Sequence, residues 1–251
     1  MSLVREIKLR HLKELLKPKP DYSILMIEVA GFKNTWLGRK RFVKKYKEVF
    51  EAGEELKQLL PQDMKVSEEC PIKAPRNIDS ITFRQMIELQ QLMSKGADME
   101  ITELMSIMIT TACLPVSNAR PYDSESNAWK NYRRRVEECS AIDMLALFNI
   151  ITQQLVESSK VWDERFQSVD VPDEDYVKAG GPDRMRQFNV TNTIRKLCQA
   201  YNCSRDEAWQ VPYIYSQMLS YSDASAAYTQ YQMSEYKRLQ MLSERQRKRT
   251  H

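Results

Sequence analysis

The chain has 251 residues, of which 42% are hydrophobic and 29% charged, with only 6 Gly and 10 Pro. This composition excludes the disordered and fibrous classes, and the scarcity of glycine favours a mainly helical protein of one large or two small domains. The net charge of +4 is unevenly spread, because residues 1–60 carry +6, residues 234–251 carry +4 and the stretch between them carries −6.

The first 75 residues predict a basic helical region followed by a linker. Apolar residues at helical spacing predict helices over residues 3–16 and 39–60. Residues 22–30 fit either a short β element or the start of a helix. Residues 61–77 hold three prolines and no sustained period, so we expect a linker there. The resulting domain boundary near residue 75 separates a region 1–75 from a main helical domain 76–251 that ends in a basic tail.

The next segment predicts a helical hairpin. Thr82-Phe83-Arg84-Gln85 fits a capping box, in which the first and fourth residues satisfy each other's backbone N–H groups, and the helix it opens ends at Lys95-Gly96. Asp98 is then expected to cap a second helix over residues 99–113. The short glycine-containing turn between the two helices predicts that they pack antiparallel.

The remaining chain predicts further helices around one acidic loop. Helices are expected over residues 128–139 and 141–161, the second as the central core element, followed by an acidic surface loop over residues 167–183. A helix then begins near Asn189. Ser204-Arg205-Asp206-Glu207 fits a second capping box.

Two aromatic-rich helices complete the prediction. Pro212 is expected to kink or start the first of them, and Asp223 to begin a last helix that ends near Arg245. The predicted fold is therefore mainly α, a multi-helix bundle with helical hairpins.

Few residue patterns favour catalysis, a cofactor or a metal. The two histidines are His11, on a short basic helix, and His251, the last residue. The five cysteines are scattered, whereas a zinc site needs several Cys or His at close spacing, so we interpret them as helix-packing residues in a reducing compartment. Gly180-Gly181 lacks the Lys-Ser/Thr of a phosphate-binding loop. We therefore predict no catalytic residue, no cofactor and no metal ligand.

The sequence also bears on location. No signal peptide is apparent at the start of the chain, so we expect synthesis in the cytoplasm. The longest apolar stretches, residues 24–29 and 105–109, are far too short to span a membrane, so we expect no membrane partner.

Basic residues cluster near both ends of the chain. Such clusters are typical either of solvated helix faces or of arms that bind an acidic partner, which would be nucleic acid or protein. Aromatic residues at helical spacing interrupt the first cluster, which favours core aromatics beneath a solvated basic face over a nucleic-acid-binding face. The candidate basic residues are Arg39, Lys40, Arg41, Lys44, Lys45, Arg245, Arg247, Lys248 and Arg249.

The C-terminal helices are unusually rich in tyrosine and methionine. Flexible methionines and tyrosines with polar tips are favoured where a surface meets another chain, and the alternative is an ordinary core edge. The predicted protein-contact residues are Tyr213, Tyr215, Met218, Tyr221, Tyr228, Tyr231 and Tyr236.

Two stretches resemble proteins that build virus particles. The segment from Asn77 to Leu89, followed by the predicted helices at 100–109 and 141–154, resembles small helical morphogenesis proteins of tailed bacteriophages. The stretch from Ile194 to Tyr231 resembles the end of tail assembly chaperones. The resemblance covers at most residues 77–231 and assigns no functional residue. It implies a non-enzymatic role in forming the virion.

Residues and resemblance together predict a non-enzymatic structural or assembly component of a tailed-phage virion, in its tail, neck or portal region. Such a protein is made in the host cytoplasm, resides in the virion and works through contacts with other virion proteins in a large oligomeric assembly. One alternative is a tail assembly chaperone that the finished particle does not retain. Another is a nucleic-acid-binding regulatory protein, whose binding would fall steeply with salt.

Overall fold

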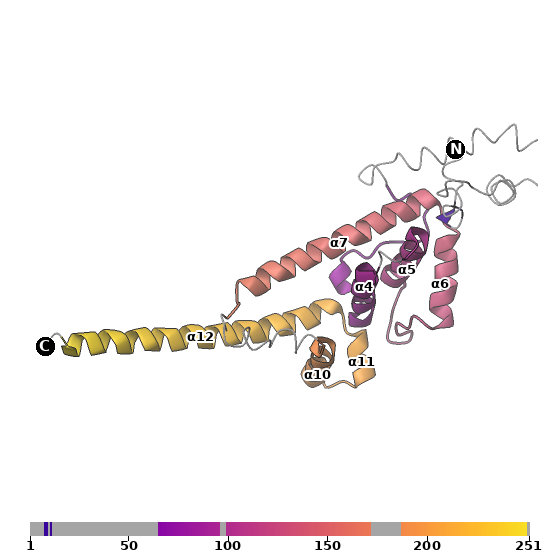
Figure 1. The fold of residues 1–251 in the computed structure, drawn as a ribbon. Helices are drawn as coiled ribbons and strands as arrows, with labels where there is room; N and C mark the ends of the chain where they lie inside the picture. Colours follow the sequence, from indigo (N-terminus) through magenta and orange to yellow (C-terminus); the bar gives the residue numbers. More distant parts are fainter. Residues whose placement is uncertain (1–7, 10, 12–64, 96–98, 172–186, 250–251) are drawn as a thin grey trace, which may run out of the picture. The chain divides into compact units, whose positions relative to one another are not determined.

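The computed structural model describes residues 8–9, 11, 65–95, 99–171 and 187–249, and this part of the chain is mainly α-helical (Figure 1). Its β structure consists of isolated bridges, such as those between Lys8 and Ser140 and between Ser117 and Arg120, and the described residues form no sheet. The predicted mainly helical fold is confirmed. The elements are η4 (Ile78–Ser80), α4 (Phe83–Lys95), α5 (Ile101–Cys113), α6 (Asn127–Glu137), α7 (Ala141–Gln167), α10 (Asn189–Tyr201), α11 (Arg205–Gln210) and α12 (Tyr213–Arg249).

Several predictions fall on residues outside this part of the chain. The predicted helix over 39–60 and the ambiguous segment 22–30 lie wholly outside the described residues, and so does most of the predicted helix over 3–16. The acidic loop is described only as far as residue 171. These predictions stay predictions.

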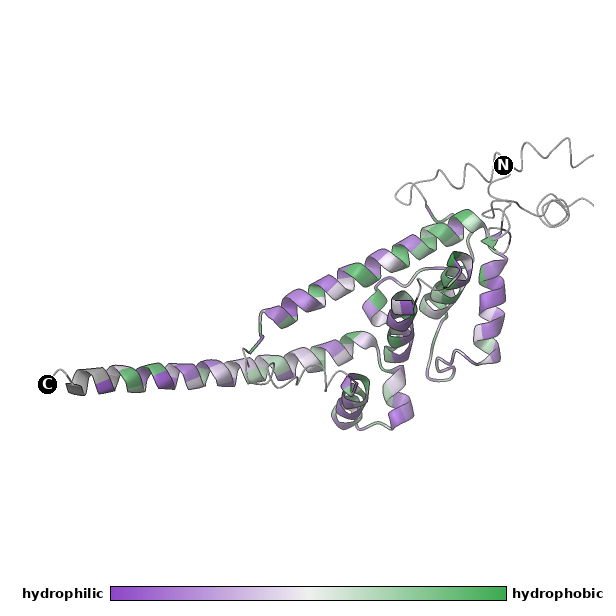
Figure 2. Cartoon of the chain, viewed as in Figure 1, coloured by the Kyte–Doolittle hydropathy of each residue, from purple (hydrophilic) through white to green (hydrophobic). Residues whose placement is uncertain are grey.

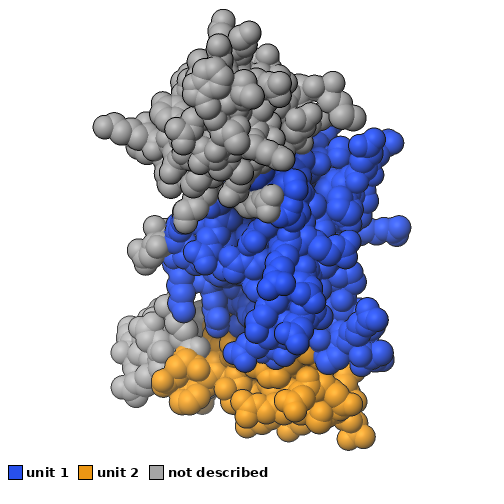
Figure 3. All heavy atoms as spheres, turned by 90° about the vertical axis from the view of Figure 1, so that its right-hand side faces the viewer, with its two compact units in different colours: residues 1–155 blue, residues 156–251 orange. Residues whose placement is uncertain are grey.

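The chain divides into two units, residues 1–155 and 156–251, and the division falls within α7 (Figure 3). Residues 65–75 belong to the first unit, where Cys70 and Ile72 are buried and the Pro75 carbonyl accepts a hydrogen bond from Gln154 Nε2 at 3.2 Å. The predicted boundary near residue 75 stays a prediction, because residues 12–64 are not described.

The first unit is built on the predicted hairpin. The capping box at the start of α4 is confirmed, because the Thr82 N–H donates to Gln85 Oε1 at 3.0 Å and the Gln85 N–H donates to Thr82 Oγ1 at 3.2 Å. Gln85 also donates from Nε2 to the Thr111 carbonyl at 2.7 Å. This bond joins the start of α4 to the end of α5, so the two helices are antiparallel.

Helix α5 lies at the centre of the first unit, in contact with both α4 and α6. Most of its side chains are buried, including Leu104, Met105, Met108 and Ile109. Figure 2 shows the corresponding run of hydrophobic residues along α5. A helix that is apolar on most sides is stable in water only when other elements surround it, and this places the core of the unit at α5.

In the second unit, α10 contacts both α11 and α12. Helix α10 ends at Asn202, whose left-handed φ of 47° closes the last turn. The predicted capping box at Ser204 and Glu207 is confirmed and starts α11. Pro212 directly precedes α12. Proline is well tolerated at a helix start, because the N–H groups there have no partner within the helix and the missing N–H of proline costs nothing.

Several element boundaries differ from the predictions. Helix α6 covers Asn127–Glu137 rather than residues 128–139. Helix α5 begins at Ile101 with Glu100 at the N-cap, so the predicted cap at Asp98, itself outside the described residues, is wrong. Helix α7 runs to Gln167 rather than residue 161. The two predicted C-terminal helices are one continuous helix, α12. Asp223 lies inside this helix and does not cap a new one. Its carboxylate instead accepts a hydrogen bond from Lys196 Nζ of α10 at 2.5 Å.

Candidate protein-contact surface

Helix α12 carries every predicted tyrosine and methionine contact residue, but the helix distributes them over two faces. Residues 18 positions apart point the same way, since 18 residues make about five turns. Tyr213 and Tyr231 are related in this way, and Tyr221 and Tyr228 lie beside them on what we call the inner face. Tyr215 and Met218 lie on the other side, which we call the outer stripe.

The first turns of the inner face are covered by the same chain. Tyr213 is buried, and the Tyr221 ring meets the ring of Phe166 edge-on, with centroids 6.0 Å apart. The Lys196–Asp223 ion pair fastens α10 to the same part of α12. Tyr213 and Tyr221 are therefore packing residues, and Tyr228 and Tyr231 further along are half-buried.

The outer stripe is exposed along its length. It consists of Tyr215, Met218, Met233 and Tyr236, with exposed fractions of 45%, 54%, 56% and 64%. The Tyr215 ring also lies against Tyr201 of α10, with centroids 5.9 Å apart, and Tyr201 is 46% exposed. The stripe consists of two pairs, Tyr215 with Met218 and Met233 with Tyr236, about 22 Å apart along the helix. Exposed large apolar side chains that lie together favour a surface that contacts another molecule.

The distal part of α12 carries three more exposed apolar residues. Leu239, Met241 and Leu242 are 58%, 55% and 45% exposed, and Figure 2 shows hydrophobic bands in this half of the helix. In Figure 1, α10 and α11 lie against the first part of α12, and the later turns continue past them. A helix with apolar residues on several sides is normally buried, which indicates a partner for this part.

The structure thus separates the predicted contact residues into two groups. Tyr215, Met218 and Tyr236 belong to the exposed outer stripe, whereas Tyr213 is core. The candidate list omitted Met233, Leu239 and Leu242. The spacing of 18 residues between Tyr215 and Met233, and between Met218 and Tyr236, is the sequence signal that could have identified the outer stripe.

The basic candidates are described only in part. Arg39, Lys40, Arg41, Lys44 and Lys45 lie outside the described residues. Arg245 is exposed on α12, and nothing is described of the side chains of Arg247, Lys248 and Arg249. In the first unit, a further basic run on α6 is partly used within the fold, since Arg133 Nε donates to Glu137 Oε1 at 2.9 Å and to Ser106 Oγ at 3.2 Å.

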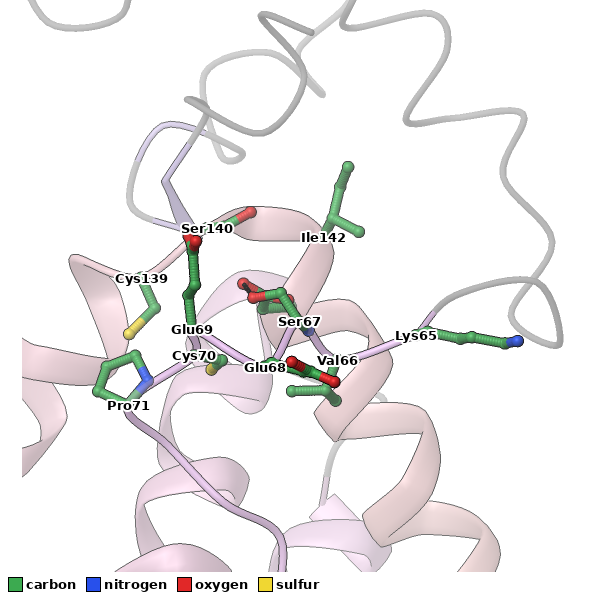
Figure 4. Close-up of a pocket in the computed structure, with 11 residues that line it drawn as sticks. Lys65, Val66, Ser67, Glu68, Glu69, Cys70, Pro71, Cys139, Ser140 and Ile142 are labelled. Atoms are coloured by element: carbon green, nitrogen blue, oxygen red, sulfur yellow. Dashed lines mark hydrogen bonds between the residues drawn. The ribbon is translucent and has the colours of Figure 1, made fainter. Parts of the chain in front are cut away.

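The first unit also contains a hollow of about 560 Å³ where residues 65–71 pass the start of α7 (Figure 4). Asp143, in the first turn of α7, accepts hydrogen bonds from the Ser67 N–H at 2.7 Å and from Ser67 Oγ at 3.1 Å. Both oxygens of this carboxylate are therefore engaged. Figure 4 shows Cys70 and Cys139 on the same side of the hollow and Lys65 extending away from them.

The thiols at this hollow are poor nucleophiles. Burial, followed by the neighbouring Cys70 and Asp143, raises the pKa of Cys139 to about 11, and burial also raises the pKa of Cys70. A thiolate is the reactive form of cysteine, so both thiols are neutral and unreactive near pH 7. Neither of these two thiols is therefore an activated nucleophile.

Other chemistry finds little support in the described chain. In that part of the chain, no three His, Cys, Asp or Glu side chains are grouped as a metal ion would require. His11 is buried, and its Nδ1 accepts a hydrogen bond from the Lys8 N–H at 3.4 Å, so it has a packing role. None of the helices described is long and apolar enough to cross a membrane.

No protein-family model, curated protein or solved structure matches this chain. The surface itself therefore carries the functional argument, and the exposed outer stripe and distal part of α12 are its main features.

Proposed function

We propose that this protein is a non-enzymatic subunit that acts through contacts with other proteins, as a structural or assembly component of the tail, neck or portal region of a tailed-phage virion. The observation that carries the contact function is the outer stripe, four large apolar side chains between 45% and 64% exposed on one face of α12. The resemblance of residues 77–109 and 194–231 to morphogenesis proteins supplies the virion setting.

The composition of the outer stripe supports a contact with protein. Two methionines and two tyrosines combine adaptable apolar surface with hydroxyl groups that can donate or accept hydrogen bonds, as protein interfaces often do. The stripe itself carries no charged side chain. It therefore fits an apolar groove on another virion protein better than a phosphate backbone, which cationic side chains recognise.

The test is mass spectrometry of purified virions made with wild-type or variant chains. The double substitution Met233→Gln with Tyr236→Gln removes the distal half of the outer stripe, and we expect the amount of this protein per particle to fall at least about tenfold. Met93→Gln is the matched control, because Met93 is a 45% exposed methionine on α4, and it should leave incorporation unchanged.

Two outcomes would overturn the proposal. Absence of the wild-type protein from particles, with retention by tail proteins in infected cells, would favour the tail assembly chaperone. Binding that falls steeply with salt and depends on Arg41, Lys44 and Lys45 would favour the nucleic-acid-binding regulator.

A further inference from the structure

The inner face of α12 continues beyond the turns that the rest of the second unit covers. Tyr213 is buried and Tyr221 packs against Phe166, yet the same face runs on through Tyr228 and Tyr231 to Leu242, which is 45% exposed. Among the described residues, the last ion pair between α12 and another helix is the one that Asp223 forms with Lys196. This face carries the large side chains Tyr228, Tyr231 and Leu242 together with charged ones, and it therefore offers both contact area and charge to a second helix.

The spacing along this face is that of a two-stranded coiled coil. Positions 228, 231, 235, 238, 242 and 245 alternate by three and four residues, as the contact positions of a heptad do. Tyr228, Tyr231 and Leu242 provide large side chains at these positions. Glu235 and Arg238 occupy the two central ones, and within one chain they form an ion pair with Arg238 Nη2 2.7 Å from Glu235 Oε2.

The central charges determine the orientation that a pair of such helices can adopt. In a parallel pair, Glu235 would face Glu235 of the second copy, and Arg238 would face Arg238. In an antiparallel pair about a two-fold axis between Tyr236 and Lys237, Glu235 faces Arg238 of the second copy, and the symmetry repeats the contact. Like charges placed opposite each other are strongly unfavourable, so the antiparallel pair is preferred.

The neighbouring positions fit the same register. Tyr231 then faces Leu242 of the second copy, and Tyr228 faces Arg245, whose guanidinium can lie over the aromatic ring. Residues 224–234 carry no charge, whereas residues 234–251 carry six basic and two acidic side chains. The antiparallel pair therefore sets each basic end against a neutral stretch and keeps the two basic ends apart.

We propose that a second copy of this chain packs on residues 224–249 of α12 as an antiparallel helical pair, centred on the reciprocal contact between Glu235 and Arg238. The overlap of 26 residues is about 39 Å long. The inference rests on the proposed function and deepens it, because it names a second copy of the chain as one of the partners. The outer stripe lies on another side of the helix and stays available for other virion proteins.

The first experiment measures the dimerisation of the full chain by sedimentation equilibrium. Glu235→Arg places four basic side chains at the centre of the pair, and Arg238→Glu places four acidic ones there, so each variant should dimerise at least about tenfold more weakly than wild type. Mixing the two variants restores opposite charges and should restore a heterodimer. Arg195→Glu, an exposed charge reversal on α10, is the control and should dimerise as wild type does.

The second experiment determines the orientation by disulfide cross-linking of the full chain. A mixture of Tyr231→Cys and Leu242→Cys chains should cross-link under mild oxidation, because these positions face each other in the antiparallel pair. The wild-type chain measures the background from the native cysteines, and Leu242→Cys alone should cross-link no more than this background. Efficient cross-linking of Leu242→Cys to itself would indicate a parallel pair and overturn the proposal.

A monomeric wild-type chain, or a dimer that both charge reversals leave intact, would also overturn it. These results are separable from the test of the proposed function. A monomer that is found in virions contradicts only the antiparallel pair, whereas a dimer that is absent from virions contradicts only the virion role.

Discussion

The carboxylate of Asp143 ties residues 65–71 to the first turn of α7. It is buried and accepts two hydrogen bonds from Ser67, one from the backbone N–H and one from the hydroxyl group. A carboxylate in the first helical turn is also favoured by the partial positive charge of the helix N-terminus. This residue therefore links two segments that are distant in sequence.

Asp143→Ala should lower the free energy of unfolding by about 2 kcal/mol, because it leaves the Ser67 N–H without its acceptor. Urea unfolding measures the change. Asp163→Ala is the control, since Asp163 lies exposed on the same helix and accepts only a 3.4 Å hydrogen bond from Ser159. It should change stability by less than about 0.5 kcal/mol, and equal effects at the two positions would contradict the assignment.

Cys113 makes stability depend on pH in alkaline solution. Burial raises the pKa of this thiol from 9.0 to about 12, so the folded protein keeps a proton that the unfolded chain loses above pH 9. The contribution of Cys113 is thus complete below pH 9 and is lost as the pH rises toward 12. Its slope reaches about 1.4 kcal/mol per pH unit.

Cys113→Ala should therefore lose stability less steeply than wild type between about pH 8 and 10, whatever its stability at neutral pH. Urea unfolding at several pH values provides both slopes. Identical slopes would show that the Cys113 thiol titrates alike in the folded and unfolded chains.

At the scale of elements, the capping boxes were the most predictable features. Thr82 with Gln85, and Ser204 with Glu207, act within four residues, so local sequence determines their geometry. The Ser204 N–H, and then its hydroxyl group, lower the pKa of Glu207 by hydrogen bonding to the ionised carboxylate. The Asp98 prediction is wrong because α5 begins at Ile101 with Glu100 at its N-cap, and the Asp223 prediction is wrong because α12 runs on continuously through this residue.

The continuity of α12 makes its distal part sensitive to proline. Gln230→Pro removes one backbone hydrogen bond and introduces a steric clash, which together cost about 3 kcal/mol in a helix interior. We expect a loss of helix signal in far-UV circular dichroism, because most of the described side chains after residue 231 are exposed and little packing opposes the unwinding of these turns. Gln230→Ala is the control and should keep the full signal; an equal signal from the proline variant would contradict a continuous helix.

At the scale of the whole molecule, the chain consists of two units, and seven of the 13 exposed large hydrophobic side chains in its described part lie on α12. Because Met233 and Tyr236 are 56% and 64% exposed, they contribute little to folding. This distinguishes the outer stripe from an ordinary core edge, which was the alternative interpretation of the same residues.

Met233→Gln with Tyr236→Gln should accordingly change the free energy of unfolding by less than about 0.5 kcal/mol. Leu197→Gln on α10 should cost about 3 kcal/mol or more, since Leu197 is fully buried and the substitution places an amide in the core. Thermal or urea unfolding compares the two. A large loss in the Met233 and Tyr236 variant would show that the outer stripe belongs to the core.

The sequence by itself determined the helical class, the hairpin of α4 and α5 and the two capping boxes, because helical period and capping depend on residues only a few positions apart. It also identified α12 as the aromatic-rich segment. Only the tertiary structure decided which of its tyrosines are core and which are surface. Tyr213 and Tyr215 are two residues apart in one helix, yet Tyr213 is buried and Tyr215 is 45% exposed, because burial depends on which distant segments of the chain pack on each side of the helix, and no local pattern specifies that.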